Sequence, residues 1–439
     1  MRTLDIIAKK RDGQALNQQE INWFIENYTN DNIPDYQVAA WLMAVYLNGM
    51  QKEEIVALTL AMANSGDTLD LSSITDYAVD KHSSGGVGDK TTLVVLPLVA
   101  SLGVPIAKMS GRGLGHSGGT LDKIESFAGY SVNLDEDTFT KLAKSQGLVL
   151  AGQTRALAPA DGKLYALRDV TGTVASLPLI ASSIMSKKIA AGAKGIVLDV
   201  KAGKGAFMHD VHEAKQLAQM MVDIGQSIGR DMIAIISDMN QPLGYAVGNA
   251  LEVVEAIETL QGAGPEDLRE HCLSIADHML KLAGRRTQWT NRQETREILE
   301  EQLDNGKAME RFRQMIAAQG GNPDDIDNLS EIHQAPIIEK ITANASGFIS
   351  EIAADQVANA SLILGAGREK KDTAIDLRVG IVINKKVGDS VTIGETIGEI
   401  HAHSEETLTA AQQYIDVTIT ITNEKVEPLP LFYDQIEGF

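Results

Sequence analysis

Apolar residues recur at helical spacing through residues 1–66, for example at Ile21 and Phe24. Pro34 separates this segment from a second one with the same spacing, and a third helix is expected to close before Gly66. This pattern predicts that the first part of the chain is all-helical.

From about residue 77 the pattern changes, and apolar runs alternate with helical periods and glycine-rich loops. Buried strands are expected over 106–109, 195–200 and 232–237. Helices are expected over 93–104, 211–224 and 248–260. Alternating strands and helices predict a layered α/β domain, here with a mixed sheet flanked by helices.

After about residue 332 the pattern changes again, to short alternating segments at 379–383 and 391–393 with glycine turns beside them. The polar stretch 320–328 is the expected linker before them. The predicted fold is therefore α/β, with a separate small all-helical domain and a C-terminal α+β module.

Composition limits the partners of the protein. The 439 residues are enough for two or three domains, and the formal net charge of −20 disfavours nucleic acid and anionic membrane surfaces. The lone Cys272 excludes an intrachain disulfide and favours a reducing compartment. The most apolar run, 93–107, is interrupted by Pro97 and Pro105, so it is too short and broken to span a bilayer. We expect a cytoplasmic protein.

The window 80–125 departs from the acidic background. Two glycine-rich loops flank an apolar stretch there, and five cations balance four acids. Glycine lets main-chain N–H groups approach an anion, while hydroxyls and lysines add donors and charge. The residues of these types are Lys81, Ser83, Thr92, Lys108, Ser110 and Thr120. The window predicts a phosphate site, although each loop alone could be an ordinary tight turn.

Two motifs in this window point elsewhere but are incomplete. Residues 113–118 match the G-x-G-x-x-G dinucleotide fingerprint, but the glycines continue and an acid follows too soon. Residues 88–91 resemble the end of a nucleotide-binding P-loop, yet Asp89 stands between the glycine and the lysine. Outside the window, His209 and His212 do not form the H-E-x-x-H zinc pattern.

A second group of polar residues lies within 164–188. Ser183 and Lys187 are four residues apart, so on a helix they share one face and can address one ligand. Arg168 can donate two hydrogen bonds to a planar acceptor. A solvated helix end would carry the same spacing, so this alternative stays open.

The run SGRGLGHSGGTLDKIE at 110–125 resembles the signature of the thymidine phosphorylase and pyrimidine-nucleoside phosphorylase family. The resemblance continues through 80–90, 164–188, 199–208 and 237–253, and therefore covers most of the chain. Within the last segment, PLGYAVGNALE is more similar to the broad-specificity pyrimidine-nucleoside branch than to the strict thymidine branch.

The resemblance implies a pentosyltransferase of nucleoside salvage or catabolism. Such an enzyme cleaves a pyrimidine nucleoside (uridine, thymidine or deoxyuridine) reversibly with inorganic phosphate, giving free base and (deoxy)ribose 1-phosphate. A strict thymidine phosphorylase, a phosphoribosyltransferase of related fold and a non-enzymatic nucleoside-binding protein are the alternatives.

The resemblance also implies a domain organisation. A small helical domain would comprise 1–66 plus about 162–193, and an α/β phosphate-binding domain about 70–160 plus 194–330. Residues 331–439 would form the C-terminal α+β domain. Similar enzymes are homodimers whose domains close on their substrates.

Residue roles follow from the same resemblance. Inorganic phosphate would be held by Lys81, Ser83, Thr92, Lys108, Ser110 and Thr120. The pyrimidine would be held by Arg168, Ser183 and Lys187. Catalysis is expected from Arg168 and Lys187, which can stabilise the departing base anion, and from His82, which can give a proton or hydrogen bond to a ring carbonyl.

The chain departs from the family at one position that concerns a metal ion. No cofactor is expected to be required, but the family implies a possible K⁺ held by Gly88, Leu243, Ala246 and Glu255. The fifth position, usually Thr, is Lys90 here. We expect Lys90 to pair with Glu255 and to replace the ion. Ser84 and Ser117 replace family threonines and keep the hydroxyl.

Overall fold

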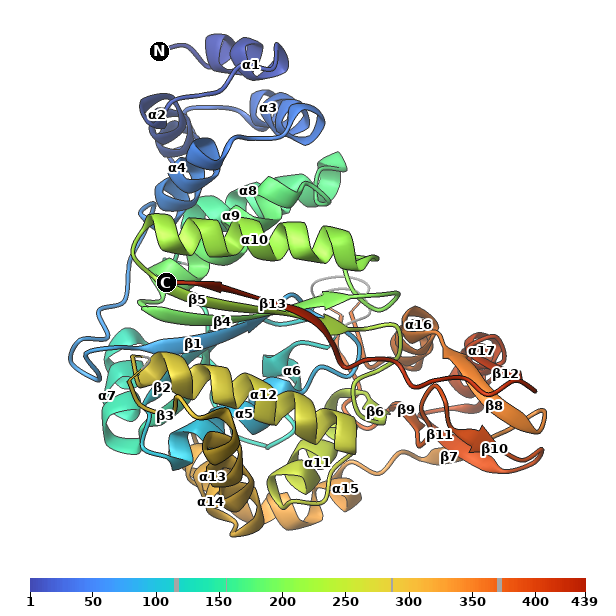
Figure 1. The fold of residues 1–439 in the computed structure, drawn as a ribbon. Coiled ribbons are helices and arrows are strands. Elements are labelled where there is room, and N and C mark those ends of the chain that lie inside the picture. Colours follow the sequence, from blue (N-terminus) through green and yellow to red (C-terminus); the bar gives the residue numbers. More distant parts are fainter. Residues whose placement is uncertain (114–117, 155, 286, 369–372) are drawn as a thin grey trace.

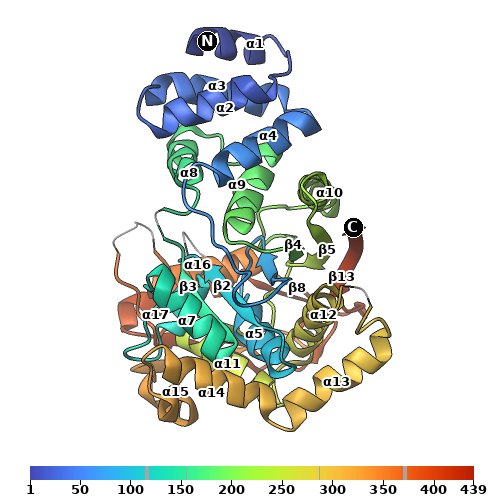
Figure 2. The same cartoon turned by 90° about the vertical axis from the view of Figure 1, so that its left-hand side faces the viewer.

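The computed structural model describes residues 1–113, 118–154, 156–285, 287–368 and 373–439. A helical lobe stands above a larger α/β lobe, and a C-terminal module lies beside the α/β lobe (Figure 1; Figure 2 shows the same ribbon turned by 90°). The Gly113–Gly118 motif and Ser117 fall wholly or partly outside the described residues.

The helical lobe is built from two separate parts of the chain. Its helices are α1 (Thr3–Arg11), α2 (Gln18–Thr29), α3 (Asp35–Asn48), α4 (Lys52–Ala63), α8 (Pro159–Thr171) and α9 (Leu177–Ala190). Phe24 and Trp41 pack with ring centroids 4.8 Å apart, and Leu164 of α8 and Leu179 of α9 join the same core. The prediction that residues 1–66 are all-helical is confirmed.

The central sheet has the strand order β1-β4-β5-β13. Its strands are β1 (Val79–Ser83), β4 (Gly195–Ala202), β5 (Asp231–Asp238) and β13 (Phe432–Gly438). The first three are parallel and β13 runs antiparallel to β5, so the sheet is mixed. Helix α10 (Val211–Ser227) covers one face and α12 (Glu266–Ala283) the other (Figure 1). The predicted α/β architecture is confirmed.

Further elements complete the α/β lobe. The strands β2 (Ile106–Ser110) and β3 (Leu148–Gly152) form a parallel pair, and β2 lies next to β1. The remaining helices are α5 (Thr91–Ser101), α6 (Thr120–Ile124), α7 (Glu136–Gln146), α11 (Asn249–Leu260), α13 (Arg292–Asp304), α14 (Lys307–Ala318) and α15 (Leu329–Ile332). The expected linker at 320–328 contains the 3-10 helix η1 (Pro323–Asn328), whose Ile326 is buried.

The C-terminal module contains two antiparallel sheets and two helices. One sheet has the order β6-β9-β11-β7 and the other the order β10-β8-β12. Their strands are β6 (Ala246–Val247), β7 (Ile337–Thr342), β8 (Gly347–Ile352), β9 (Gly380–Ile383), β10 (Ser390–Val391), β11 (Thr396–Ala402) and β12 (Ile419–Thr422). The helices are α16 (Ala354–Leu364) and α17 (Glu405–Ile415).

The strand expected at 391–393 is shorter than predicted. It ends at Val391, because Gly394 turns the chain at φ +81° and Ile393 is 66 % exposed. Two strands also cross the boundary expected near residue 330: β13 returns to the central sheet, and β6 leaves the α/β lobe to pair with β9. The C-terminal module is therefore connected to the α/β lobe by strand pairing in both directions.

Within the residues that the structure describes, every helix is too short or too polar to cross a bilayer.

Candidate active site

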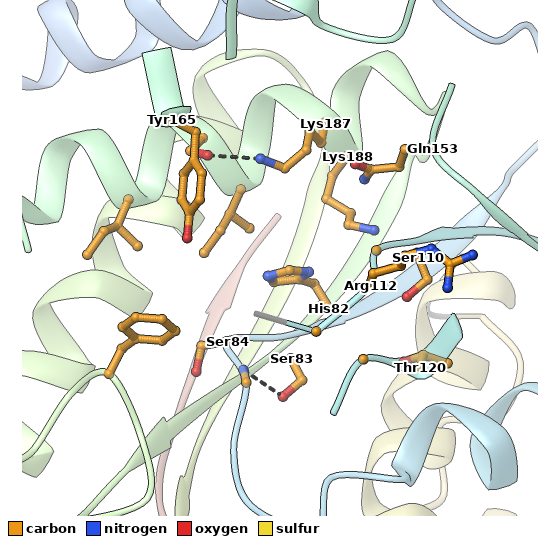
Figure 3. A pocket seen from close by; sticks show the side chains of 18 of the residues that line it. His82, Ser83, Ser84, Ser110, Arg112, Thr120, Gln153, Tyr165, Lys187 and Lys188 are labelled. Atoms are coloured by element: carbon orange, nitrogen blue, oxygen red, sulfur yellow. Dashed lines mark hydrogen bonds between the residues drawn. The ribbon is translucent and has the colours of Figure 1, made fainter. Parts of the chain in front are cut away.

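A cavity of about 500 Å³ lies between the helical lobe and the α/β lobe. The α/β side is formed by the carboxyl ends of β1 and β2 and the loops that follow them, where α/β sheets commonly bind ligands. Helices α8 and α9 form the opposite wall. Figure 3 shows His82 rising between Tyr165, Lys187 and Lys188 on one side and Ser83, Ser110 and Thr120 on the other.

The structure brings most of the predicted residues to this cavity. The predicted residues that line it are His82, Ser83, Thr92, Lys108, Ser110, Thr120, Arg168, Ser183 and Lys187. Lys81 lies deeper: its ammonium is buried and donates to Thr91 Oγ1 at 2.5 Å. Thr91 Oγ1 in turn donates to Asp89 Oδ1 at 2.6 Å, so Lys81 supports the glycine loop from below.

Strand β1 is unusual because three of its five residues, Asp80, Lys81 and His82, are ionisable. Asp80 accepts from the ammonium groups of Lys108 at 2.9 Å and of Lys188 at 2.8 Å, one on each carboxylate oxygen. Burial alone would raise the pKa of Asp80, but these two lysines outweigh it and hold the pKa well below its usual range. Asp80 thus keeps two cations at the cavity wall, where an anion would bind.

The surroundings of His82 favour its uncharged form. Burial, followed by the positive charges of Lys188 and Lys108, lowers the pKa of His82 well below its ordinary value. A neutral imidazole still carries one N–H group and can donate a hydrogen bond to a ligand carbonyl. Transfer of a proton from His82 would first require an anion, such as bound phosphate, to raise its pKa.

The glycine loop after β1 is shaped for close approach. Gly85 has φ +96°, and its amide donates to Ser83 Oγ at 3.2 Å. The loop ends at α5, whose first turn carries Thr92 into the cavity wall. The main-chain amides of a glycine loop and the positive end of a helix dipole both favour an anion at such a position.

The second loop is held by Asp122. Its carboxylate accepts from the amides of Gly113 at 2.7 Å and Gly119 at 3.2 Å. It also pairs with Arg112 at 3.1 Å and with Arg368 of the C-terminal module at 2.7 Å. Asp122 therefore has a structural role that fixes the loop carrying Thr120.

On the helical wall, Lys187 is positioned by two partners. Its ammonium contacts Asp161 Oδ2 at 2.5 Å and donates to Ser183 Oγ at 2.8 Å. Ser183 and Lys187 share a face of α9, as their spacing predicts. The arrangement presents a cation and a hydroxyl side by side to the cavity.

Arg168 both stabilises the loop between α8 and α9 and lines the cavity. Its guanidinium donates to the carbonyls of Val174 at 2.6 Å, Leu179 at 3.0 Å and Thr173 at 3.4 Å. These contacts use only part of its five N–H donors, and Arg168 also lines the cavity. Burial lowers the pKa of Arg168, but a guanidinium remains charged at any working pH.

Several residues of the cavity wall were not predicted from the sequence. They are Asp161, Tyr165, Ile180, Ile184, Lys188 and Phe207. Asp80 lies behind this wall and pairs with Lys188. Tyr165, Ile180 and Ile184 fall at helical spacing with Arg168, Ser183 and Lys187, so the face shared by these groups could have revealed them. Phe207 follows β4 and is 59 % exposed. Residue spacing could not predict that Phe207 lines the cavity, because Phe207 lies in a loop with no regular periodicity. Tertiary folding brings this loop to the cavity.

Carboxylates in the described part of the chain are not arranged for a divalent metal. Across the described ranges, no group of three or more His, Cys, Asp or Glu side chains could hold a metal ion. Asp89 and Asp122, in the two loops, are occupied by Thr91 and by arginines and amides, respectively.

Models of known protein families match three parts of the chain. Residues 4–66 match the family described as "Glycosyl transferase family, helical bundle domain", and residues 75–309 match "Glycosyl transferase family, a/b domain". Residues 348–422 match "Pyrimidine nucleoside phosphorylase C-terminal domain".

Pyrimidine-nucleoside phosphorylases of several bacteria match over nearly their whole length. A pyrimidine-nucleoside phosphorylase of Geobacillus stearothermophilus is 53 % identical over 436 residues, which cover 99 % of this chain and 100 % of the relative. One from Staphylococcus haemolyticus is 54 % identical over 405 residues, which cover 92 % of this chain and 93 % of the relative.

The fold also resembles a solved structure. The crystal structure of anthranilate phosphoribosyltransferase from Thermus thermophilus matches with a TM-score of 0.59 at 18 % identity. That match covers 72 % of this chain and 99 % of that one and shows a shared fold alone.

Proposed function

The chain belongs to the pyrimidine-nucleoside phosphorylase family, and from this premise we propose that it cleaves uridine, thymidine and deoxyuridine reversibly with inorganic phosphate. The products are the free base and ribose or deoxyribose 1-phosphate. The family assignment made from the sequence is confirmed, and the enzyme is a pentosyltransferase.

One observation carries the proposal: the same cavity has a wall of cations, hydroxyls and glycines and, facing it, a wall with an arginine and a lysine. The first wall offers Lys108, Ser110 and Thr120 beside glycine amides. The second offers Arg168 and Lys187 between apolar side chains. Such a site can hold phosphate and a nucleoside at the same time.

Phosphate acts as the nucleophile in this proposal. Held by the α/β wall, it attacks the anomeric carbon of the sugar while the bond from that carbon to the base nitrogen breaks. Positive charge develops on the sugar and negative charge on the base, and the phosphate dianion faces the former. Fixing the two reactants in line removes much of the entropic barrier.

The departing base is stabilised from the helical wall. Arg168 and Lys187 place positive charge where the base becomes an anion, and one such donor is typically worth roughly 3 kcal/mol of barrier. His82, which lines the middle of the cavity, donates a hydrogen bond to a ring carbonyl from its neutral imidazole. A proton can follow once bound phosphate has raised its pKa.

We also propose that the two lobes close on the substrates. Chain segments that join the lobes run side by side: the amide of Asp67 donates to Ala156 O at 2.9 Å, and that of Leu69 to Ala190 O at 2.8 Å. Gly66 and Gly192 allow this close packing, because a Cβ atom at either would strike a neighbouring carbonyl oxygen. A narrow connection of this kind supports a hinge, and closure would exclude water as a competing nucleophile.

A homodimer in the cytoplasm completes the proposal. Tyr36, Met43 and Leu47 form an exposed apolar stripe along α3, and Leu4 of α1 is exposed too. A second copy of the chain could cover this face through a two-fold axis. The buried, unpaired thiol of Cys272 supports a reducing compartment.

Turnover separates the proposal from its alternatives. Purified enzyme with uridine or thymidine should release base only when phosphate is added, in the absence of magnesium. A phosphoribosyltransferase would instead consume a 5-phosphoribosyl pyrophosphate with Mg²⁺, and a binding protein would release nothing. Comparing initial rates on uridine and thymidine distinguishes a broad enzyme from a strict thymidine phosphorylase.

A further inference from the structure

Lys90 is a charged side chain buried completely beneath the glycine loop. Its side chain is 0 % exposed, and its partner Glu255 on α11 is 6 % exposed. Lys90 is the residue that precedes the first turn of α5, directly between Asp89 and the helix that bears Thr92. Interactions that fix the position of Lys90 therefore also fix the N-terminus of α5.

The ammonium of Lys90 sits in a group of oxygen atoms. It donates to Leu243 O at 3.1 Å and to Ala246 O at 2.9 Å, and it forms an ion pair with Glu255. Gly244, at φ +68°, passes so close that a Cβ atom there would crowd both Glu255 and the ammonium. These oxygens are a ligand set suited to a monovalent cation.

Main-chain amides hold the carboxylate of Glu255 in position beside the ammonium of Lys90. Its second oxygen accepts from the amides of Tyr245 at 2.8 Å and Ala246 at 3.1 Å. Burial would lower the pKa of Lys90, but Glu255 and the more distant Glu252 raise it overall. This environment favours the charged ammonium, and the loop at 242–247 folds around it.

The neighbouring Lys386, from the C-terminal module, binds the other side of the same loop. It donates to Pro242 O and Gly244 O, each at 2.7 Å, and pairs with Asp267 at 2.6 Å. The carbonyls of this loop are therefore directed at two ammonium groups, which come from different parts of the chain.

The residues present do not fit the K⁺ ion that the family resemblance implies. Of the four residues that would hold the ion, Leu243, Ala246 and Glu255 direct oxygens at the ammonium of Lys90, which already occupies the space between them. The carbonyl of the fourth, Gly88, accepts from the amide of Lys90 at 2.9 Å. A second cation placed there would meet like charge in a buried site.

We propose that Lys90 is a built-in monovalent cation: it takes the place of a bound K⁺, joins α5 to α11 and the 242–247 loop, and makes the fold independent of K⁺. Lys90 is a positioning residue, because it supports the helix that carries Thr92 and does not line the cavity. Only its predicted effect on phosphate binding rests on the proposed function.

The test is thermal unfolding of the full-length chain, which needs no turnover. The wild-type melting temperature should be the same in KCl, NaCl and choline chloride at equal ionic strength. Lys90→Thr should melt at least about 5 °C lower in choline chloride, because a buried pair is broken. Added KCl should restore most of that loss, and LiCl much less.

Two controls define the result. Lys90→Met fills the space with an uncharged chain, so it should lose stability without recovery in KCl. Lys204→Thr, which removes a lysine paired with Glu351 at the surface, should melt like the wild type in every salt. In Lys90→Thr the KM for phosphate should also rise in choline chloride and fall again in KCl.

Three outcomes would overturn the inference. One is a wild-type melting temperature that rises specifically with K⁺, a measurement that stands even if no Lys90 variant folds. The others are a Lys90→Thr variant as stable as wild type without K⁺, and one whose loss no monovalent cation reverses. Inactive wild-type enzyme with the expected melting behaviour would instead refute the proposed function alone.

Discussion

Replacing Arg168 with methionine should damage the enzyme in two measurable ways. The guanidinium contributes donors to the cavity and also holds the loop between α8 and α9 through three main-chain carbonyls. Methionine keeps much of the length and apolar stem but has no donor. The variant should therefore lose both catalysis and stability of the helical lobe.

The structure sets the size of each loss. The contacts to Val174 O and Leu179 O, at 2.6 and 3.0 Å, are short, whereas the one to Thr173 O, at 3.4 Å, is weak. With roughly 1.5–3 kcal/mol for a hydrogen bond to a charged group, and partial replacement by water, we expect a loss of about 2–5 kcal/mol of unfolding free energy. Removal of one donor to the base anion should lower kcat roughly 10²–10³-fold.

Lys187→Met is the matched comparison. It should lower kcat by a similar factor but cost only about 1–2 kcal/mol, because Asp161 stays at the N-terminal turn of α8, where a carboxylate is favoured. Arg168→Lys tests charge alone and should not recover stability, since one ammonium cannot reach the same carbonyls.

The assays are urea unfolding followed by circular dichroism, and initial rates with uridine at saturating phosphate. An Arg168→Met variant that unfolds like the wild type would refute the structural role of Arg168. A defect confined to the KM for phosphate would refute its assignment to the base.

Three other predictions concern separate parts of the molecule. His82→Ala should lower kcat more than it raises the KM for nucleoside, because its hydrogen bond strengthens as the base acquires charge; an unchanged kcat in steady-state assays would remove this role. Ser110→Ala and Thr120→Ala should each raise the KM for phosphate and leave the KM for uridine nearly constant, so a rise confined to uridine would contradict the phosphate assignment. Burial, with the charges of Arg292 and Lys281, lowers the pKa of His278 to about 4 in the folded state. Because this is below the unfolded value of about 6.5, its contribution is fully present above pH 6.5 and is lost toward pH 4, by up to about 1.4 kcal/mol per pH unit. The unfolding free energy at pH 5 and 7.5 should therefore differ less in His278→Gln than in the wild type, and equal differences would count against it.

Local pattern was sufficient for much of the fold. The apolar runs that became β4 and β5 are continuous and β-branched, and the amphipathic periods that became α10 and α11 follow one face, so each could be predicted from its own residues. The glycine-rich loops could also be predicted locally, because the glycines that allow close approach of the main chain are adjacent in the sequence.

Strand β1 could not be predicted in this way. Its sequence, VDKHS, places three ionisable residues in succession in one strand of the central sheet. Lys108 and Lys188, which lie 28 and 108 residues away from Asp80, neutralise that carboxylate and make its burial possible. A strand of this composition resembles a loop until its partners are known.

The sequence alone determined which residue types were available: hydroxyls, lysines and glycines in two loops, and an arginine, a serine and a lysine on helices. The tertiary structure decided which of them meet. It brought α8 and α9 opposite the loops of β1 and β2, sent Lys81 beneath the cavity, and set Lys90 against Glu255, 165 residues further along. Contacts over such separations depend on the path of the whole chain and on the burial of charges in pairs, and neither is expressed in any local run of residues.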